Sequence, residues 1–185
     1  MHRVVTHGGK EWSNAGEDRV ELVDPDPLWA TQYEMEARAL LSVLPRVNGL
    51  RLEHFGSTAI PNLRAKPIID ILLVHPEPAL WPELVSPIAS LGYVYWSENP
   101  RKDRMFFVKG MPPFGSRRTH HVHVRVPIDT TAELSLRNLL RSNPTLTRRY
   151  AMLKEGLATR YPNDRDAYTD GKAEFIAKVL RQDAV

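Results

Sequence analysis

The chain has 185 residues, of which 42% are hydrophobic and 25% are charged, and this composition is typical of one soluble globular domain with a real core. It contains no cysteine, which excludes disulfide frameworks, thiolate metal sites and thiol nucleophiles and is consistent with a reducing compartment. No apolar run is long enough to span a membrane, and residues 1–19 lack the apolar segment of a secretory signal. We therefore expect a cytoplasmic protein that has no membrane partner.

Positive charge is concentrated in one segment, although the net charge is only +3. Residues 99–125 contain one acid, Asp103, and seven basic residues: Arg101, Lys102, Arg104, Lys109, Arg117, Arg118 and Arg125. A local excess of this kind favours an anionic partner, and a solvated loop surface explains it about equally well. We expect the partner to be a phosphorylated small molecule or a nucleotide, with nucleic acid as a weaker alternative.

The predicted elements begin after residues 1–19, which have no periodicity and are expected to form a flexible extension to a domain that spans 20–185. In chain order, the patterning predicts a strand at 20–23, a helix at 27–44, strands at 50–55 and 68–74, a helix at 79–91, strands at 93–96, 104–109 and 119–126, and helices at 130–141, 146–161 and 172–181. Asp26 is expected to cap the first helix, and Pro87 predicts a kink or an interruption in the second. This order predicts an α+β or mixed α/β fold, with a mixed sheet flanked by helices and a helical C-terminal third.

A Gly-Ser turn followed by a buried strand is the most informative stretch. Gly56, Ser57 and Thr58 are expected to expose backbone N–H groups and a hydroxyl to an anion such as a phosphate. Asp70 is the one acid in the apolar run 68–74, and a buried carboxylate is costly unless a cation or hydrogen bonds meet it. A functional role for Asp70 is therefore favoured over capping a helix or pairing with a nearby cation.

The strand predicted at 119–126 carries a second candidate set. Because side chains alternate along a strand, His121, His123 and Arg125 share one face. Two imidazoles with a carboxylate such as Asp70 form a ligand set for one divalent metal, and Mg²⁺, Mn²⁺ and Zn²⁺ all remain candidates. The same residues can instead bind a phosphate, with histidine as proton donor and Arg125 as clamp. Half-buried histidines bonded to backbone are the structural alternative, and no organic cofactor is predicted.

Further candidates lie on either side of these strands. Lys66, just before the strand that holds Asp70, either contacts a phosphate or pairs with a surface acid. Arg137 can flank the same cleft from the helical third, and Tyr168 and Lys172, four residues apart, can reach a ligand. For these three residues a solvated or packed position is the simpler alternative.

Longer stretches of the sequence resemble the GrpB family, also known as UPF0157. The resemblance rests on Glu53–Pro61 (EHFGSTAIP) and Ala65–Ile71 (AKPIIDI), with support from Asp26–Trp29, the His-x-His strand and the Tyr168-x-x-x-Lys172 spacing. It covers about residues 20–180, nearly everything except the N-terminal extension. The family is also found as a domain fused to dephospho-CoA kinase.

That family is similar to the nucleotidyltransferases with the polymerase-β-like fold. The resemblance implies that Gly56 and Ser57 hold the phosphates of a nucleotide, and that acids on neighbouring strands, beginning with Asp70, hold Mg²⁺. The pattern places a second acid two residues further on, where this chain has Leu72, and a histidine of the His-x-His strand stands in for the third. Because the two-Mg²⁺ mechanism needs paired carboxylates, we expect a departure from it here.

Three functional hypotheses follow. The leading one is a nucleotidyltransferase-like protein that binds a nucleotide or another phosphorylated small molecule and transfers the nucleotidyl group to an acceptor in a metal-dependent reaction. The first alternative is a non-catalytic binding module that has kept the pocket. The second is an enzyme with a single metal held by His and Asp, acting on a phosphoester or a small metabolite.

Overall fold

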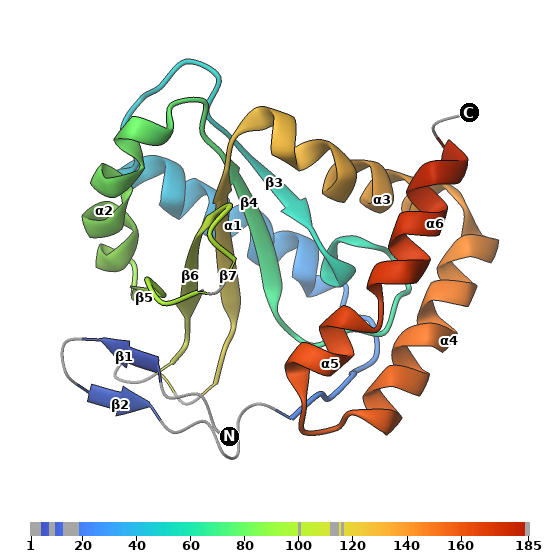
Figure 1. Ribbon diagram of the computed structural model, residues 1–185. Coiled ribbons are helices and arrows are strands. Elements are labelled where there is room, and N and C mark those ends of the chain that lie inside the picture. Colours follow the sequence, from blue (N-terminus) through green and yellow to red (C-terminus); the bar gives the residue numbers. More distant parts are fainter. Residues whose placement is uncertain are drawn as a thin grey trace.

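A five-stranded mixed sheet forms the centre of the fold (Figure 1). The computed structural model describes residues 5–7, 10–12, 19–99, 101–111, 115 and 117–183. The strands of the sheet are β3 (Arg51–Phe55), β4 (Ile69–Val74), β5 (Tyr93–Tyr95), β6 (Met105–Lys109) and β7 (His120–Arg125). They lie in the order β3-β4-β7-β6-β5, in which β4 and β7 are parallel and all other neighbours are antiparallel. Each strand ends within one residue of its predicted bounds, so these five predictions are confirmed.

The prediction of a strand at 20–23 was wrong. Val23 forms only an isolated bridge with Ala65, and the N–H of Val20 donates to the carbonyl of Pro162, 2.7 Å away. The two ends of the segment therefore bond to different parts of the chain. No single neighbouring strand offers the continuous ladder that a β-strand requires.

The described part of the chain also contains six α-helices. They are α1 (Leu28–Val43), α2 (Val85–Ser90), α3 (Thr131–Ser142), α4 (Pro144–Arg160), α5 (Arg165–Asp170) and α6 (Ala173–Asp183). The helix predicted at 79–91 is divided into a 3₁₀ segment, Pro78–Leu84, and the short α2, because each proline in this run removes a backbone donor. Helix α5 was not predicted; the side chain of Asp164 begins it by accepting a hydrogen bond from the N–H of Ala167.

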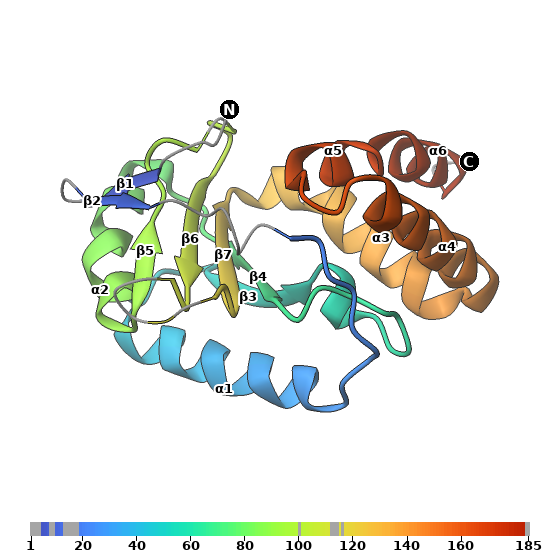
Figure 2. The same ribbon diagram turned by 90° about the horizontal axis from the view of Figure 1, so that it is seen from below.

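The two faces of the sheet have different coverings. One face, with Ile71 of β4 and Val122 of β7 at its centre, packs against α1 and α2 in the main hydrophobic core. Figure 2 shows α1 running along this face and helices α3 to α6 grouped beyond the β3–β4 side of the sheet. The opposite face carries Asp70, His121 and His123, and looks toward the helical C-terminal third.

The prediction of a flexible extension at 1–19 falls mostly on residues outside the described part of the chain. Among the described residues of this segment, β1 (Val5–His7) and β2 (Lys10–Trp12) form an antiparallel pair, which we did not predict from the sequence. Among the described residues, no helix combines the length and the apolar character needed to cross a membrane.

Candidate active site

The parallel pairing of β4 with β7 brings the main candidate residues together. Asp70 stands directly opposite His121, and Leu72 stands opposite His123. All four side chains therefore belong to the same face of the sheet. Two residues that are 51 positions apart in the sequence thus become direct neighbours.

Asp70, His121 and His123 form one polar cluster. The Nδ1 of His121 lies 2.9 Å from Oδ1 of Asp70, and the Nε2 of His123 lies 3.7 Å from the same oxygen. One ligand atom from each of the three residues lies within 4.8 Å of the others. The Nε2 atoms of both histidines are buried, and within the described part of the chain they have no hydrogen-bond partner.

The cluster combines an ionised carboxylate with neutral imidazoles. Burial lowers the pKa of both histidines, that of His121 to about 3, because the charged imidazolium loses its hydration. Burial opposes ionisation of Asp70 as well, but the hydrogen bond from His121 and the proximity of both imidazoles outweigh it and hold the pKa of the carboxyl well below its usual range. A neutral imidazole can supply the N–H that such a bond needs, so the two findings agree for the His121–Asp70 pair.

Gly56 lies against the carboxylate of Asp70. Its φ of +72° is a left-handed conformation that favours glycine. A Cβ added at this position would stand 2.5 Å from Oδ2 of Asp70. The glycine of the predicted phosphate turn therefore also makes room for the acid.

Thr58 secures this turn to the sheet. Its hydroxyl donates to the carbonyl of Ile68 at 3.2 Å and accepts from the Nε2 of His54 at 3.1 Å. His54 is buried and stacks on Tyr33, and burial lowers its pKa to about 4. The hydroxyl of Thr58 is thus occupied within the protein, and Gly56 and Ser57 line the cavity beside it.

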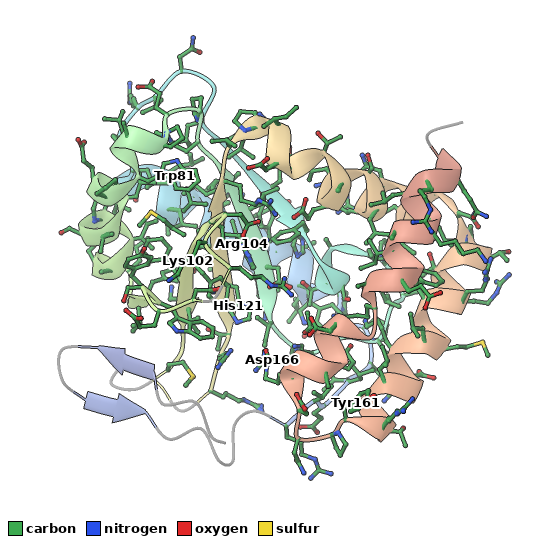
Figure 3. The ribbon with its side chains drawn as sticks, viewed as in Figure 1. Trp81, Lys102, Arg104, His121, Tyr161 and Asp166 are labelled. Atoms are coloured by element: carbon green, nitrogen blue, oxygen red, sulfur yellow. The ribbon has the colours of Figure 1, made fainter. Side chains whose placement is uncertain are left out.

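A cavity of about 520 Å³ lies over this face, in the size range of small-molecule sites. The cluster, the Gly-Ser turn and residues of α3 to α6 all line it. Its lining includes apolar residues from more than one hydrophobic cluster: Phe55, Ile60, Ile68, Trp96, Phe106, Leu136, Leu140 and Ile176. Figure 3 shows Arg104 and His121 over the sheet, with Asp166 of α5 across from them.

The cavity lining is also strongly cationic. Seven described lining residues are basic: Lys66, Arg101, Arg104, Arg118, Arg137, Arg165 and Lys172. Three described lining residues are acidic: Asp70, Glu133 and Asp166. The cavity therefore favours an anionic ligand.

Lys66 and Lys172 approach each other from two different parts of the chain. Their ammonium groups lie 5.3 and 4.5 Å from the ring centroid of Tyr168, and within the described part of the chain neither forms an ion pair. Burial and neighbouring cations lower the pKa of Lys172 to about 8 and that of Lys66 well below its usual value. An anion bound between them would relieve this repulsion.

Two predicted phosphate ligands are already engaged by protein groups. Arg125 shares the face of His121 as expected, but it is buried, binds Glu133 and lies 2.9 Å from Asp103. It does not line the cavity. Arg137 does line the cavity, while its Nη1 bonds to Glu53 at 2.8 Å and to the carbonyl of His54 at 2.9 Å.

Several lining residues were not singled out from the sequence. The basic segment 99–125 contains Arg101, Arg104 and Arg118, but nothing in its pattern separates them from Lys109, which pairs with Glu36 of α1 at 2.7 Å. Trp96, Glu133 and Arg165 also line the cavity, and no local motif marks them. Only the folding of the last third over the sheet brings Glu133 and Arg165 to this place.

Comparison with known proteins identifies the family of this chain. The family model described as "GrpB protein" matches residues 19–182. The chain belongs to the GrpB family. A UPF0157 protein of Pseudomonas aeruginosa is 52% identical over 93% of this chain and 71% of its own length. The crystal structure of the conserved protein GrpB from Enterococcus faecalis superposes with a TM-score of 0.75 at 35% identity, covering 88% of this chain and 96% of that one.

A more distant relative of this chain is a longer protein. A dephospho-CoA kinase of Mycolicibacterium paratuberculosis is 29% identical over 88% of this chain, and the match covers 46% of that kinase. The chain therefore spans about half the length of this relative.

Proposed function

We propose that this GrpB protein is nucleotidyltransferase-like and binds a nucleotide or another phosphorylated small molecule in the cavity. The observation that carries the proposal is the pair Lys66 and Lys172, two half-buried ammonium groups that lack carboxylate partners among the described residues and face one cavity. Burying two cations near each other is unfavourable without an anion to compensate them. Phosphate is an anion of suitable charge and size.

The cationic residues of the cavity suit the phosphates of such a ligand, and the apolar residues suit its base. Phosphate oxygens fit between Lys66 and Lys172, close to the Gly56-Ser57 turn. The aromatic rings of Phe106 and Trp96, both in the lining, suit a nucleobase or a similar flat group. The indole N–H of Trp96 is buried and has no hydrogen-bond partner among the described residues.

The proposed reaction is nucleotidyl transfer to an acceptor. An acceptor oxygen forms a bond to the α-phosphorus, the bond from that phosphorus to the bridging oxygen breaks, and pyrophosphate leaves with the bonding electrons. The proton of the acceptor hydroxyl passes to a nearby base. The Asp70–His121–His123 cluster offers two roles in this step, as proton acceptor or as ligands of one divalent ion, and metal binding distinguishes them.

The relative named dephospho-CoA kinase supports a phosphorylated ligand. Its name describes a kinase of dephospho-CoA, and the match to this chain covers 46% of it. Dephospho-CoA is therefore a useful probe beside the common nucleoside triphosphates.

The test is calorimetric titration of ATP, GTP, CTP, UTP, dephospho-CoA and pyrophosphate into metal-free protein at fixed ionic strength. We expect at least one nucleotide to bind, and Lys66→Gln and Lys172→Gln each to weaken it roughly 10- to 100-fold, because each removes one charge-assisted contact. Lys178→Gln is the matched control, since Lys178 is exposed on α6 and outside the cavity. Circular dichroism and thermal melting establish that each variant is folded.

Two results would overturn the proposal: no binding of any probe, or equal affinity in wild type and in both cavity variants. Turnover is then assayed with the nucleotide that binds. Binding without turnover for any acceptor would assign the chain as a binding module, a reading that Leu72 in place of a second acid supports.

A further inference from the structure

We infer that Asp70, His121 and His123 hold a single divalent transition-metal ion, represented here by Zn²⁺, in place of the pair of Mg²⁺ ions that the resemblance to nucleotidyltransferases implies. The inference assigns the cluster one of the two roles named above, that of metal ligand. Metal binding is measured without any nucleotide, so its test is independent of the proposed function. The inference rests on the chemistry of the donor atoms and on their spacing.

The spacing of the three donors suits one ion. Oδ1 of Asp70 lies 2.9 Å from Nδ1 of His121 and 3.7 Å from Nε2 of His123. Two ligands at the usual Zn–N and Zn–O distances of about 2.0–2.2 Å stand roughly 3–4 Å apart. Neighbouring positions on two paired strands supply all three residues, and their ligand atoms all lie within 4.8 Å of one another, so the two imidazoles need to draw closer together when the ion binds.

Hydrogen bonding does not explain the 3.7 Å separation between Nε2 of His123 and Oδ1 of Asp70. The separation is too long for a bond between these residues, and among the described residues the Nε2 of His123 has no other partner. A buried imidazole nitrogen that faces a carboxylate without bonding to it is the arrangement that a shared metal ion would complete.

The donor set does not fit two Mg²⁺ ions. Mg²⁺ requires near-octahedral oxygen coordination, and imidazole nitrogen instead suits Zn²⁺, Fe²⁺ and their neighbours. The position of the second carboxylate is Leu72, which is fully buried. Another acid of the cavity lining, Glu133, is engaged by Arg125.

Two contacts must give way when the ion binds. The first is the hydrogen bond from Nδ1 of His121 to Asp70, because a ring nitrogen that binds the metal cannot carry a proton. The second involves Arg104. Nη1 of Arg104 lies 3.4 Å from Nδ1 of His123, and that nitrogen carries the ring proton if Nε2 binds the metal. The contact is at the long limit of a hydrogen bond. Asp103 already holds the same guanidinium through two bonds of 3.1 and 2.9 Å, so losing the third contact costs little.

The test is titration of chelator-stripped protein with Zn²⁺, Co²⁺ and Mg²⁺, followed by calorimetry and by the visible absorption of bound Co²⁺. We expect one equivalent of Zn²⁺ to bind and an excess of Mg²⁺ not to displace it. Asp70→Asn, His121→Ala and His123→Ala should each weaken Zn²⁺ at least 10-fold and reduce the Co²⁺ bands. Asp70→Asn preserves side-chain volume, so it keeps the test valid if a histidine variant does not fold.

His120→Ala is the matched control. His120 adjoins His121 on β7 but belongs to the opposite face of the strand, and its ring contacts the hydroxyl of Thr119 at 3.0 Å. Its Zn²⁺ affinity should equal that of wild type. The inference fails if wild type binds no Zn²⁺, if Mg²⁺ competes on equal terms, or if the three site variants bind as wild type does. None of these results bears on nucleotide binding, which is measured separately in metal-free protein with the lysine variants.

Discussion

At the scale of single residues, the site depends on a glycine that serves two purposes. Gly56 has a left-handed backbone conformation, and it also leaves the space that the carboxylate of Asp70 occupies. Any side chain at this position meets both a backbone penalty and a steric clash. The sequence indicates the turn, but only the structure shows that the turn and the acid are in contact.

Gly56→Ala separates the two effects when it is compared with Gly49→Ala. Gly49 has a similar φ of +83°, but a Cβ there would lie 3.8 Å from the nearest heavy atom, the Cγ of Pro76. We expect each variant to lose about 1–2 kcal/mol of unfolding free energy from backbone strain, measured by chemical denaturation. Only Gly56→Ala should also displace Asp70 and weaken Zn²⁺. Equal Zn²⁺ affinities in the two variants would show that the close approach of Gly56 to Asp70 is unimportant.

At the scale of elements, Arg125 connects three parts of the cavity wall. From the end of β7 it binds Glu133 on α3 and Asp103 in the loop before β6. That loop also supplies Arg101 and Arg104 to the cavity. We therefore assign Arg125 a positioning role in place of the predicted contact with phosphate.

Arg125→Met should lower the free energy of unfolding by about 1–3 kcal/mol, because it leaves two carboxylates without their shared, buried cation. It should also weaken nucleotide binding through the loosened loop. Arg38→Met is the control: Arg38 forms an ion pair with Glu34 in which the side chains are 78% and 61% exposed, and its loss should cost less than about 0.5 kcal/mol. Chemical denaturation and nucleotide titration check both variants. A stability loss in Arg125→Met no greater than in Arg38→Met would contradict the positioning role.

The elements also show what the sequence can and cannot predict. A nearly continuous apolar run predicts β4 and an alternating pattern predicts β7, each to within one residue. The alternation of side chains along a strand then correctly places Asp70 and His121 on the faces where they meet. Local patterns fail where long-range contacts decide the structure. Apolar and polar residues alternate over 20–23, but the segment forms only an isolated bridge and no strand. Arg125 lies on the predicted face, but it binds acids that only the tertiary fold brings close to it.

At the scale of the whole molecule, the cavity exists because the helical third folds against the β3–β4 side of the sheet. Lys66 precedes β4 on the sheet side, and Lys172 joins α5 to α6 on the helical side. A phosphate between them would bind both parts of the molecule at once. The sequence identifies both lysines as candidates, but the distance between them along the chain conceals that they meet at the same aromatic ring.

The central claim is tested most directly by a crystal structure of the protein grown with the nucleotide that binds most tightly. We predict that a phosphate group lies between Lys66 and Lys172, within hydrogen-bond distance of both ammonium groups, and that the base lies against apolar residues of the cavity lining. A nucleotide bound instead in a different pocket, one lined by Arg19, Arg64 and Glu155, with the cavity free of ligand, would contradict the account.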